Sequence, residues 1–162
     1  MDIDRSDFEQ RVKSAFDHIF STLFKLKPEE SGLLPCSKQI EEEKREVAIL
    51  IQFIGGIEGK IIMSCSRRTA ENIVKVLYPE ATDNDEDDTV MRDAIKSSLG
   101  EMMNILSGKL AFSFQKEYGT TRITTPAMIS GNLLLITIYD NSSVNCCFDS
   151  RFENLEIILS LC

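Results

Sequence analysis

The clearest hydrophobic pattern in the chain runs from about residue 89 to residue 112 or a little beyond, and Gly119 marks a break after it. Apolar side chains recur there at helical spacing, at Met91, Ile95, Leu99, Met102, Leu106 and Leu110. Such a stripe is typical of a helix that packs one side against a core. On the other side, Ser97, Glu101, Asn104 and Gly108 are spaced four, three and four residues apart, so they share a face. The pattern predicts a long helix with a carboxylate and an amide on its open side.

Weaker patterns predict the remaining elements. An amphipathic helix is expected at 6–26, with Ser6 and Glu9 forming a capping box, and another helix at 67–77. Strands are expected at 33–38, 46–54, 57–65, 120–126, 133–139, 144–149 and 152–161. Since strands and helices do not alternate, we expect an α+β fold with a mostly antiparallel sheet and about three helices. No linker or repeat divides residues 1–162, which indicates a single domain.

Composition narrows the possible functions. The formal net charge is −8, which argues against nucleic-acid binding. The N-terminus has no signal-peptide pattern, and the apolar runs are too short to cross a membrane as helices, so we expect a cytoplasmic protein. There is one histidine, His18, and the five cysteines contain no CxxC pair, so no metal site is expected. We interpret the adjacent Cys146 and Cys147 as packing residues rather than redox sensors.

An acidic run occupies 83–88. Its spacing resembles the start of an EF-hand calcium loop, but Asp88 and Ala94 stand where that loop requires Gly and Glu. We interpret the run as a solvated loop whose end places negative charge at the N-terminus of the long helix. Its charge is expected to influence the docking of a partner.

The polar face of the long helix carries the most promising candidate chemistry. Glu and Asn three residues apart occur on many solvated helices, so this spacing alone is weak evidence for a site. The face also contains small residues, namely Ser97, Gly100, Ser107 and Gly108. Each glycine costs about 1 kcal/mol relative to alanine inside a helix. A face that retains such residues favours close approach by another molecule.

With these residues in place, the sequence resembles the CheC/CheX/FliY group of chemotaxis phosphatases. That group carries Asp or Ser, three residues, Glu, two residues, Asn, about twenty-two residues and then Pro. Here Ser97, Glu101 and Asn104 match, and Pro126 follows Asn104 after twenty-one residues. The resemblance covers about 46–161. CheC-type members carry two Glu-x-x-Asn helices, whereas the helix expected at 6–26 contains no Asn, so the chain is more similar to the CheX type.

The resemblance implies a fold, a partner and an activity. It implies an α+β homodimer, formed by joining sheet edges, that removes the phosphoryl group from the aspartyl phosphate of a CheY-type response regulator. Asn104 would orient the attacking water, and Glu101 would pair with the regulator's active-site lysine. Mg²⁺ would be bound by the regulator, and the chain would need no cofactor of its own. Ser97, Gly100, Ser107, Gly108 and Pro126 would shape the surface that meets the partner.

Two other functional classes fit the same residues. The chain could be a binding module that docks to a response regulator or motor component without turnover, with Glu101 and Asn104 as contact residues. It could also be a structural dimer whose polar stripe is only solvated. Replacing Asn104 by alanine separates the first two classes, since binding should survive while turnover falls.

Overall fold

The computed structural model describes residues 3–36, 45–82, 88–131 and 143–162. In chain order its elements are α1 (Arg5–Thr22), α2 (Pro28–Ser31), β1 (Leu34–Cys36), β2 (Val47–Gly55), β3 (Gly59–Cys65), α3 (Arg67–Leu77), η2 (Pro79–Thr82), α4 (Asp88–Tyr118), β4 (Thr121–Ile123), β5 (Ala127–Ser130), β6 (Ser143–Ser150) and β7 (Glu153–Leu161). The strand expected at 133–139 and the acidic residues 83–87 lie outside the described residues. So does the end of the strand expected at 33–38.

The strands of the described residues form one antiparallel sheet. Its order is β1-β6-β7-β3-β2-β4, and β5 also pairs with β2. β2 and β3, the strands expected at 46–54 and 57–65, pair as a hairpin, with Val47 opposite Cys65 and Phe53 opposite Gly59. All of the strand pairs are antiparallel. Together with the helices expected near 6–26, 67–77 and 89–112, this arrangement confirms the predicted α+β class.

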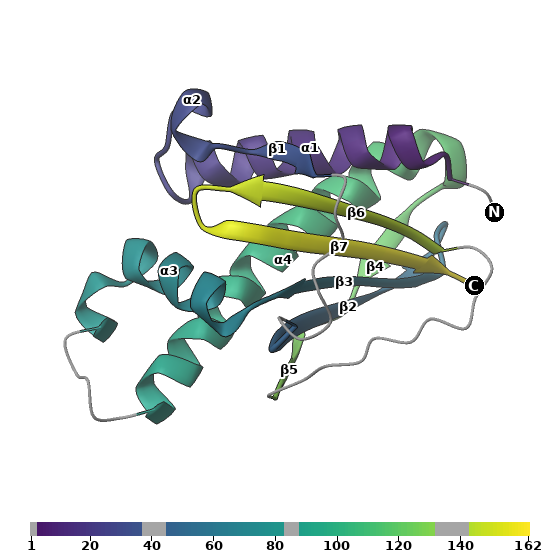
Figure 1. The fold of residues 1–162 in the computed structure, drawn as a ribbon. Coiled ribbons are helices and arrows are strands. Elements are labelled where there is room, and N and C mark those ends of the chain that lie inside the picture. Colours follow the sequence, from purple (N-terminus) through teal and green to yellow (C-terminus); the bar gives the residue numbers. More distant parts are fainter. Residues whose placement is uncertain (1–2, 37–44, 83–87, 132–142) are drawn as a thin grey trace.

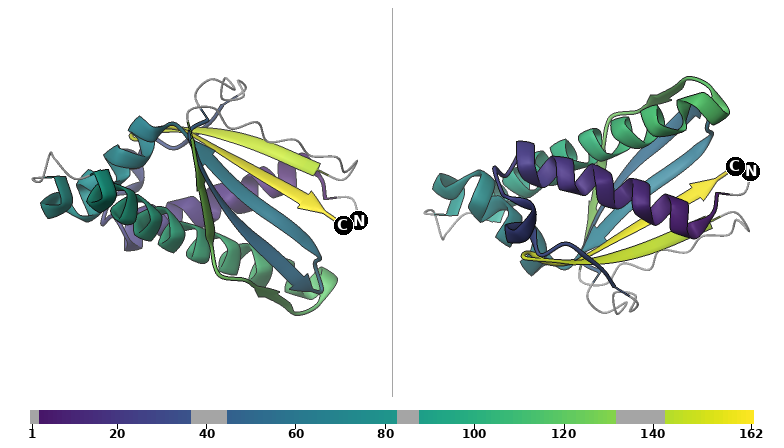
Figure 2. Two further views of the ribbon diagram at one scale, coloured as in Figure 1. Left: turned by 90° about the horizontal axis from the view of Figure 1, so that it is seen from below. Right: turned by 90° about the horizontal axis from the view of Figure 1, so that it is seen from above.

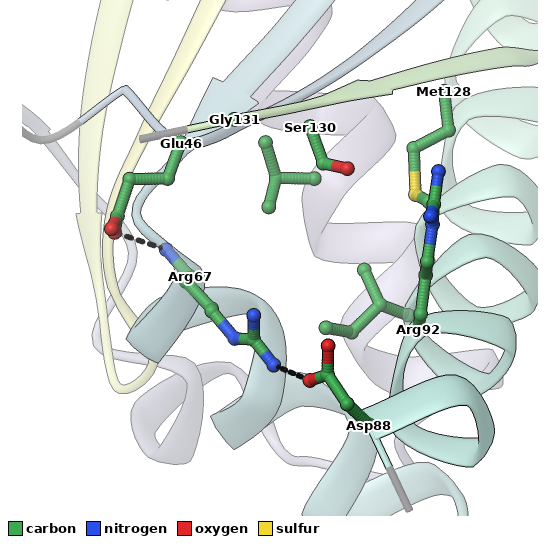
Figure 3. A pocket seen from close by; sticks show the side chains of 9 residues that line it. Glu46, Arg67, Asp88, Arg92, Met128, Ser130 and Gly131 are labelled. Atoms are coloured by element: carbon green, nitrogen blue, oxygen red, sulfur yellow. Dashed lines mark hydrogen bonds and ion pairs between the residues drawn. The ribbon is translucent and has the colours of Figure 1, made fainter. Parts of the chain in front are cut away.

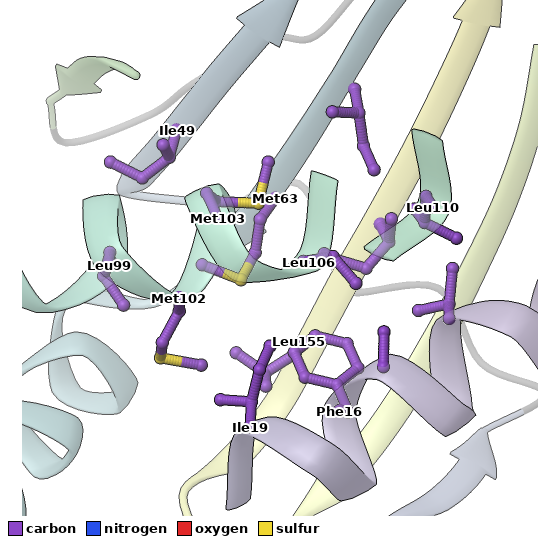
Figure 4. Close-up of a cluster of buried hydrophobic side chains, with 14 of the residues drawn as sticks. Phe16, Ile19, Ile49, Met63, Leu99, Met102, Met103, Leu106, Leu110 and Leu155 are labelled. Atoms are coloured by element: carbon purple, nitrogen blue, oxygen red, sulfur yellow. The ribbon is translucent and has the colours of Figure 1, made fainter. Parts of the chain in front are cut away.

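Helices α1 and α4 pack against one face of this sheet (Figures 1 and 2). Alternate residues of a strand point to the same face, so every second residue of the central strands is apolar and buried there. Figure 4 shows the resulting core, in which strand residues meet side chains from both helices. Its labelled members are Phe16, Ile19, Ile49, Met63, Leu99, Met102, Met103, Leu106, Leu110 and Leu155.

The opposite face of the sheet holds a buried polar cluster. Glu156 is fully buried on β7 and accepts two hydrogen bonds from the Arg45 guanidinium, at 2.6 and 2.7 Å. Ser64 and Asn145 each donate to the same carboxylate at 2.8 Å. A buried carboxylate needs this number of donors to offset the loss of water.

Helix α1 starts and ends earlier than expected. The predicted Ser6 cap is wrong, because the N-cap is Asp4, whose carboxylate accepts the Asp7 backbone N–H at 3.0 Å. The helix ends at Thr22 rather than near residue 26, and Lys25 then takes a left-handed conformation with φ 57°. His18 is exposed on this helix.

Helix α4 spans 31 residues and ends at Tyr118, a little beyond residue 112 and directly before the expected break at Gly119. Its first residue is Asp88, the end of the acidic run, as expected for negative charge at a helix N-terminus. Its last turns are held by Arg11 of α1, which donates to the Ser113 carbonyl oxygen at 2.6 Å and to Glu117 at 2.7 Å. The Arg11 guanidinium also lies 4.2 Å from the centre of the Phe114 ring. These contacts of Arg11 stabilise the last turns of α4 against α1.

The strand expected at 120–126 is wrong in extent, because an irregular segment interrupts it. Phe53 pairs with Ile123 and Leu50 pairs with Ala127, so two residues of β2 face three residues, 124–126. One extra residue on one strand is a β-bulge. Proline has no N–H to give to the ladder, so Pro126 is suited to such an interruption. The segment therefore leaves the sheet edge just before β5.

Candidate functional site

The candidate catalytic pair lies on the solvent side of α4. Glu101 and Asn104 are both exposed, as is Ser97 one turn earlier. The opposite side of the same helix enters the core, where Met102, Met103 and Leu106 are 0% exposed. The local 3.6-residue periodicity thus separates a buried face from an open one.

A groove lies between this part of α4 and the bulge before β5. Its volume is about 590 Å³. The residues that line it are Ile49, Tyr78, Asp93, Lys96, Ser97, Gly100, Glu101, Asn104, Thr125, Pro126 and Met128. Five of the residues singled out in the sequence therefore meet at one surface, although Pro126 comes from a segment remote from α4 along the chain.

Two hydrogen bonds attach the start of the bulge to β2. The Thr124 backbone N–H donates to the Gln52 carbonyl oxygen at 3.1 Å, and the Gln52 N–H donates to the Thr124 hydroxyl at 3.0 Å. Pro126 then packs over the helix at Gly100, where an added Cβ would lie 3.9 Å from the Pro126 Cβ. The proline ring therefore forms a fixed wall of the groove, and Gly100 is buried beneath it.

The polar groups of the pair are available for another molecule. Within the described residues, neither the Glu101 carboxylate nor the Asn104 amide has a hydrogen-bond or ion-pair partner. An amide offers both a donor and an acceptor, whereas a carboxylate at neutral pH only accepts. The arrangement can orient a water molecule and bind a cationic side chain at the same surface.

Two residues that the sequence placed on the partner-facing surface do not line this groove. Ser107 is fully buried, and its hydroxyl has no hydrogen-bond partner, so its assignment to this surface is wrong. Gly108 lies in a separate hollow between α1 and α4. Ser107 comes ten residues after Ser97, which places it about 80° away around the helix axis. It therefore lies at the border of the polar stripe, where the packing of other elements determines whether a side chain is buried.

The sequence reading missed several lining residues of the groove. Tyr78 comes from the end of α3, Asp93 and Lys96 from the first turns of α4, and Met128 from β5. Asp93 and Lys96 precede the motif by one turn on the same helix, so helical spacing could have identified them. Tyr78 and Met128 had no local signal, because only the packing of α3 and β5 brings them here.

A smaller pocket of about 170 Å³ lies beside the groove, at the N-terminal ends of α3 and α4 (Figure 3). Its charges pair with one another. Arg67 forms ion pairs with Asp88 and Glu71, and its backbone N–H donates to Glu46 at 2.8 Å. The hydrogen bonds from Arg67 to Glu71 and Asp88 raise the pKa of the guanidinium. Since most of these polar groups already have partners, the groove at Glu101 and Asn104 is the stronger candidate site.

Among the described residues, no group of three or more His, Cys, Asp or Glu side chains is placed to hold a metal ion. None of the helices in this part of the chain is both long enough and apolar enough to span a bilayer.

Comparisons with known proteins agree with the motif. Residues 47–148 match the family described as "Chemotaxis phosphatase CheX". The chain is 32% identical over 95 residues to "CheY-P phosphatase CheX" of Thermotoga maritima, a match that covers 59% of this chain and 58% of that protein. The chain thus aligns with little more than half the length of that relative.

Solved structures share the fold. The "CheX-CheY-BeF3-Mg+2 complex from Borrelia burgdorferi" matches with a TM-score of 0.74 and 20% identity, over 96% of this chain and 97% of that one. Chemotaxis protein CheX from Desulfovibrio desulfuricans matches with a TM-score of 0.73 and 16% identity, over 96% and 99% of the two chains. At these identities the structural likeness establishes the fold alone.

Proposed function

The chain belongs to the CheX family of chemotaxis phosphatases, and from this premise we propose that it hydrolyses the aspartyl phosphate of a CheY-type response regulator. The observation that carries the proposal is the Glu101–Asn104 pair. Both side chains are exposed at one groove and have no partner among the described residues. The name of the Thermotoga maritima relative, a CheY-P phosphatase, supports the same substrate.

The proposed reaction requires few catalytic groups from the phosphatase. An acyl phosphate has a good leaving group, and its loose transition state mainly requires a water molecule positioned in line with the bond that breaks. The Asn104 amide would hold that water, which attacks phosphorus while the regulator's aspartate departs as a carboxylate. Glu101 would accept hydrogen bonds from the regulator's active-site lysine and fix the orientation of the two proteins.

Mg²⁺ would enter with the regulator. Bound there it would neutralise charge on the phosphoryl oxygens, and the Borrelia burgdorferi CheX–CheY complex includes Mg²⁺. Ser97, Gly100 and Pro126 would shape the groove that receives the phosphorylation site.

We also propose that the protein works in the cytoplasm. The resemblance implies in addition that two chains form a homodimer. Static light scattering tests the dimer, with an expected mass of twice the 18.3 kDa of one chain.

The decisive experiment measures phosphate release from a phosphorylated, Mg²⁺-loaded regulator. Wild type is compared with Asn104→Ala, Glu101→Ala and the control Gln115→Ala, which removes another exposed amide from α4. We expect Asn104→Ala to lower kcat by about 100-fold or more, because misplacement of the nucleophile is costly. Glu101→Ala should chiefly raise KM, and Gln115→Ala should behave as wild type.

Two results would contradict the proposal. If the wild type does not accelerate phosphate release from any regulator in a panel from the same cell, the chain is a binding module or a structural dimer. If it accelerates release but Asn104→Ala is unaffected, the phosphatase uses another group to orient water.

A further inference from the structure

Phe112 is the most exposed large hydrophobic side chain of the described residues, with 76% of its surface accessible. It lies on α4 well away from the core that the rest of the helix covers. Aromatic side chains are enriched in protein interfaces, where they often act as anchors. Nothing within the described chain explains why this helix presents a phenyl ring to water.

The ring continues the stripe that carries the catalytic pair. Ser97, Glu101, Asn104, Gly108 and Phe112 follow at spacings of three or four residues on α4. At 1.5 Å per residue, Phe112 lies about 12 Å along the helix axis from Asn104. A standard interface covers about 800 Å² per partner, a disc of roughly 16 Å radius. A partner centred on Asn104 therefore reaches Phe112.

A hollow accompanies the ring. The space has a volume of about 470 Å³ and is lined by five residues of α1 and four of α4, namely Asp7, Gln10, Arg11, Ser14, Ala15, Gly108, Lys109, Phe112 and Ser113. An added Cβ at Gly108 would meet no atom within 4 Å, so folding does not require glycine there. The hydrogen bonds from Arg11 to Ser113 and Glu117 hold α1 against α4, so the hollow between the two helices is already formed before a partner binds.

We propose that Phe112 and the hollow at Gly108 form a second part of the docking surface for the phosphorylated regulator. The ring contacts the regulator's surface beside the phosphorylation site, and the hollow receives one of the regulator's side chains. This inference rests on the proposed function, since the partner is the receiver domain that presents its phosphoryl group to Asn104.

The test measures binding separately from turnover. The ligand is a regulator loaded with Mg²⁺ and beryllofluoride, and every variant is made in the Asn104→Ala background so that only docking is measured. Phe112→Ser should weaken binding about tenfold, the effect of losing an interface anchor. Phe112→Leu should restore most of the affinity. Val90→Ser is the matched control, because Val90 is a partly exposed α4 residue about 21 Å from Asn104.

In the protein that retains Asn104, Phe112→Ser should raise the KM of phosphate release and leave kcat unchanged. Equal affinities for Phe112→Ser and its parent, or no binding to any regulator, would overturn the inference. So would a fall of the solution mass by half in Phe112→Ser without a change in affinity, because the ring would then contact a second copy of the chain. Phe112-dependent binding without phosphate release by the wild type would leave the inference standing and refute the proposed activity.

Discussion

Alanine substitutions at three glycines test the packing at the groove, at the hollow between α1 and α4, and at the turn between β2 and β3. Gly100 and Gly108 both lie inside α4, whereas Gly56 lies in the turn between β2 and β3. A Cβ at Gly108 would meet nothing within 4 Å, and one at Gly100 would make an ordinary contact with Pro126 at 3.9 Å. A Cβ at Gly56 would lie 2.5 Å from the Gly119 carbonyl oxygen and closer still to that of Tyr118.

The atoms around each glycine determine how the substitution changes the free energy of unfolding. In a helix interior, alanine is favoured over glycine by about 0.8–1 kcal/mol, so Gly108→Ala should stabilise the protein by that amount. Gly100→Ala should gain about 1–2 kcal/mol, because its new methyl group is also buried against Pro126. Gly56→Ala forces backbone oxygens apart and should cost about 2–3 kcal/mol. A change of 1 kcal/mol shifts Tm by about 2–4 °C in a chain of this size.

Urea unfolding followed by circular dichroism gives the free energy of unfolding for each variant. The reasoning predicts an order of stability in which Gly100→Ala is highest and Gly56→Ala lowest, with unchanged m-values. A loss of stability in Gly100→Ala would mean that Pro126 lies closer to α4 than the structure has it. A loss in Gly108→Ala would mean that the hollow between α1 and α4 is filled.

Two further predictions concern buried groups. Ser107→Ala should raise the free energy of unfolding by about 1 kcal/mol in urea melts, because it removes a buried hydroxyl that has no hydrogen-bond partner; a loss of stability would indicate a hidden acceptor. Burial raises the pKa of the Cys65 thiol to about 12, from an ordinary 9.0, so the thiol binds its proton more tightly in the folded state. Its contribution to stability is complete below about pH 9 and is lost as the pH rises towards 12, and Cys65→Ala should flatten this decline in urea melts; equal slopes would refute the assignment.

The site could be predicted only in part from the sequence. The residues of α4 that share a face with Glu101 and Asn104 follow from helical spacing, and the motif identified the family. The contact between Gly100 and Pro126 had no local signal, because it depends on the pairing of β4 and β5 with β2 and on the extra residue between them. Ser107 was misassigned, since periodicity places it at the border of the stripe and only packing buries it.

The fold divides in the same way. Periodicity by itself determined the long helix, the helix at 67–77 and the β2–β3 hairpin, because backbone hydrogen bonding fixes the 3.6- and 2-residue repeats within each element. Only the three-dimensional structure showed that the last turns of α4 pack against α1, where Arg11 donates to Ser113 and Glu117 across more than a hundred residues of sequence. Tertiary packing also determines which side chains surround Glu101 and Asn104. A groove between elements exists only once the elements are packed, so its walls cannot be read from the spacing along any one of them.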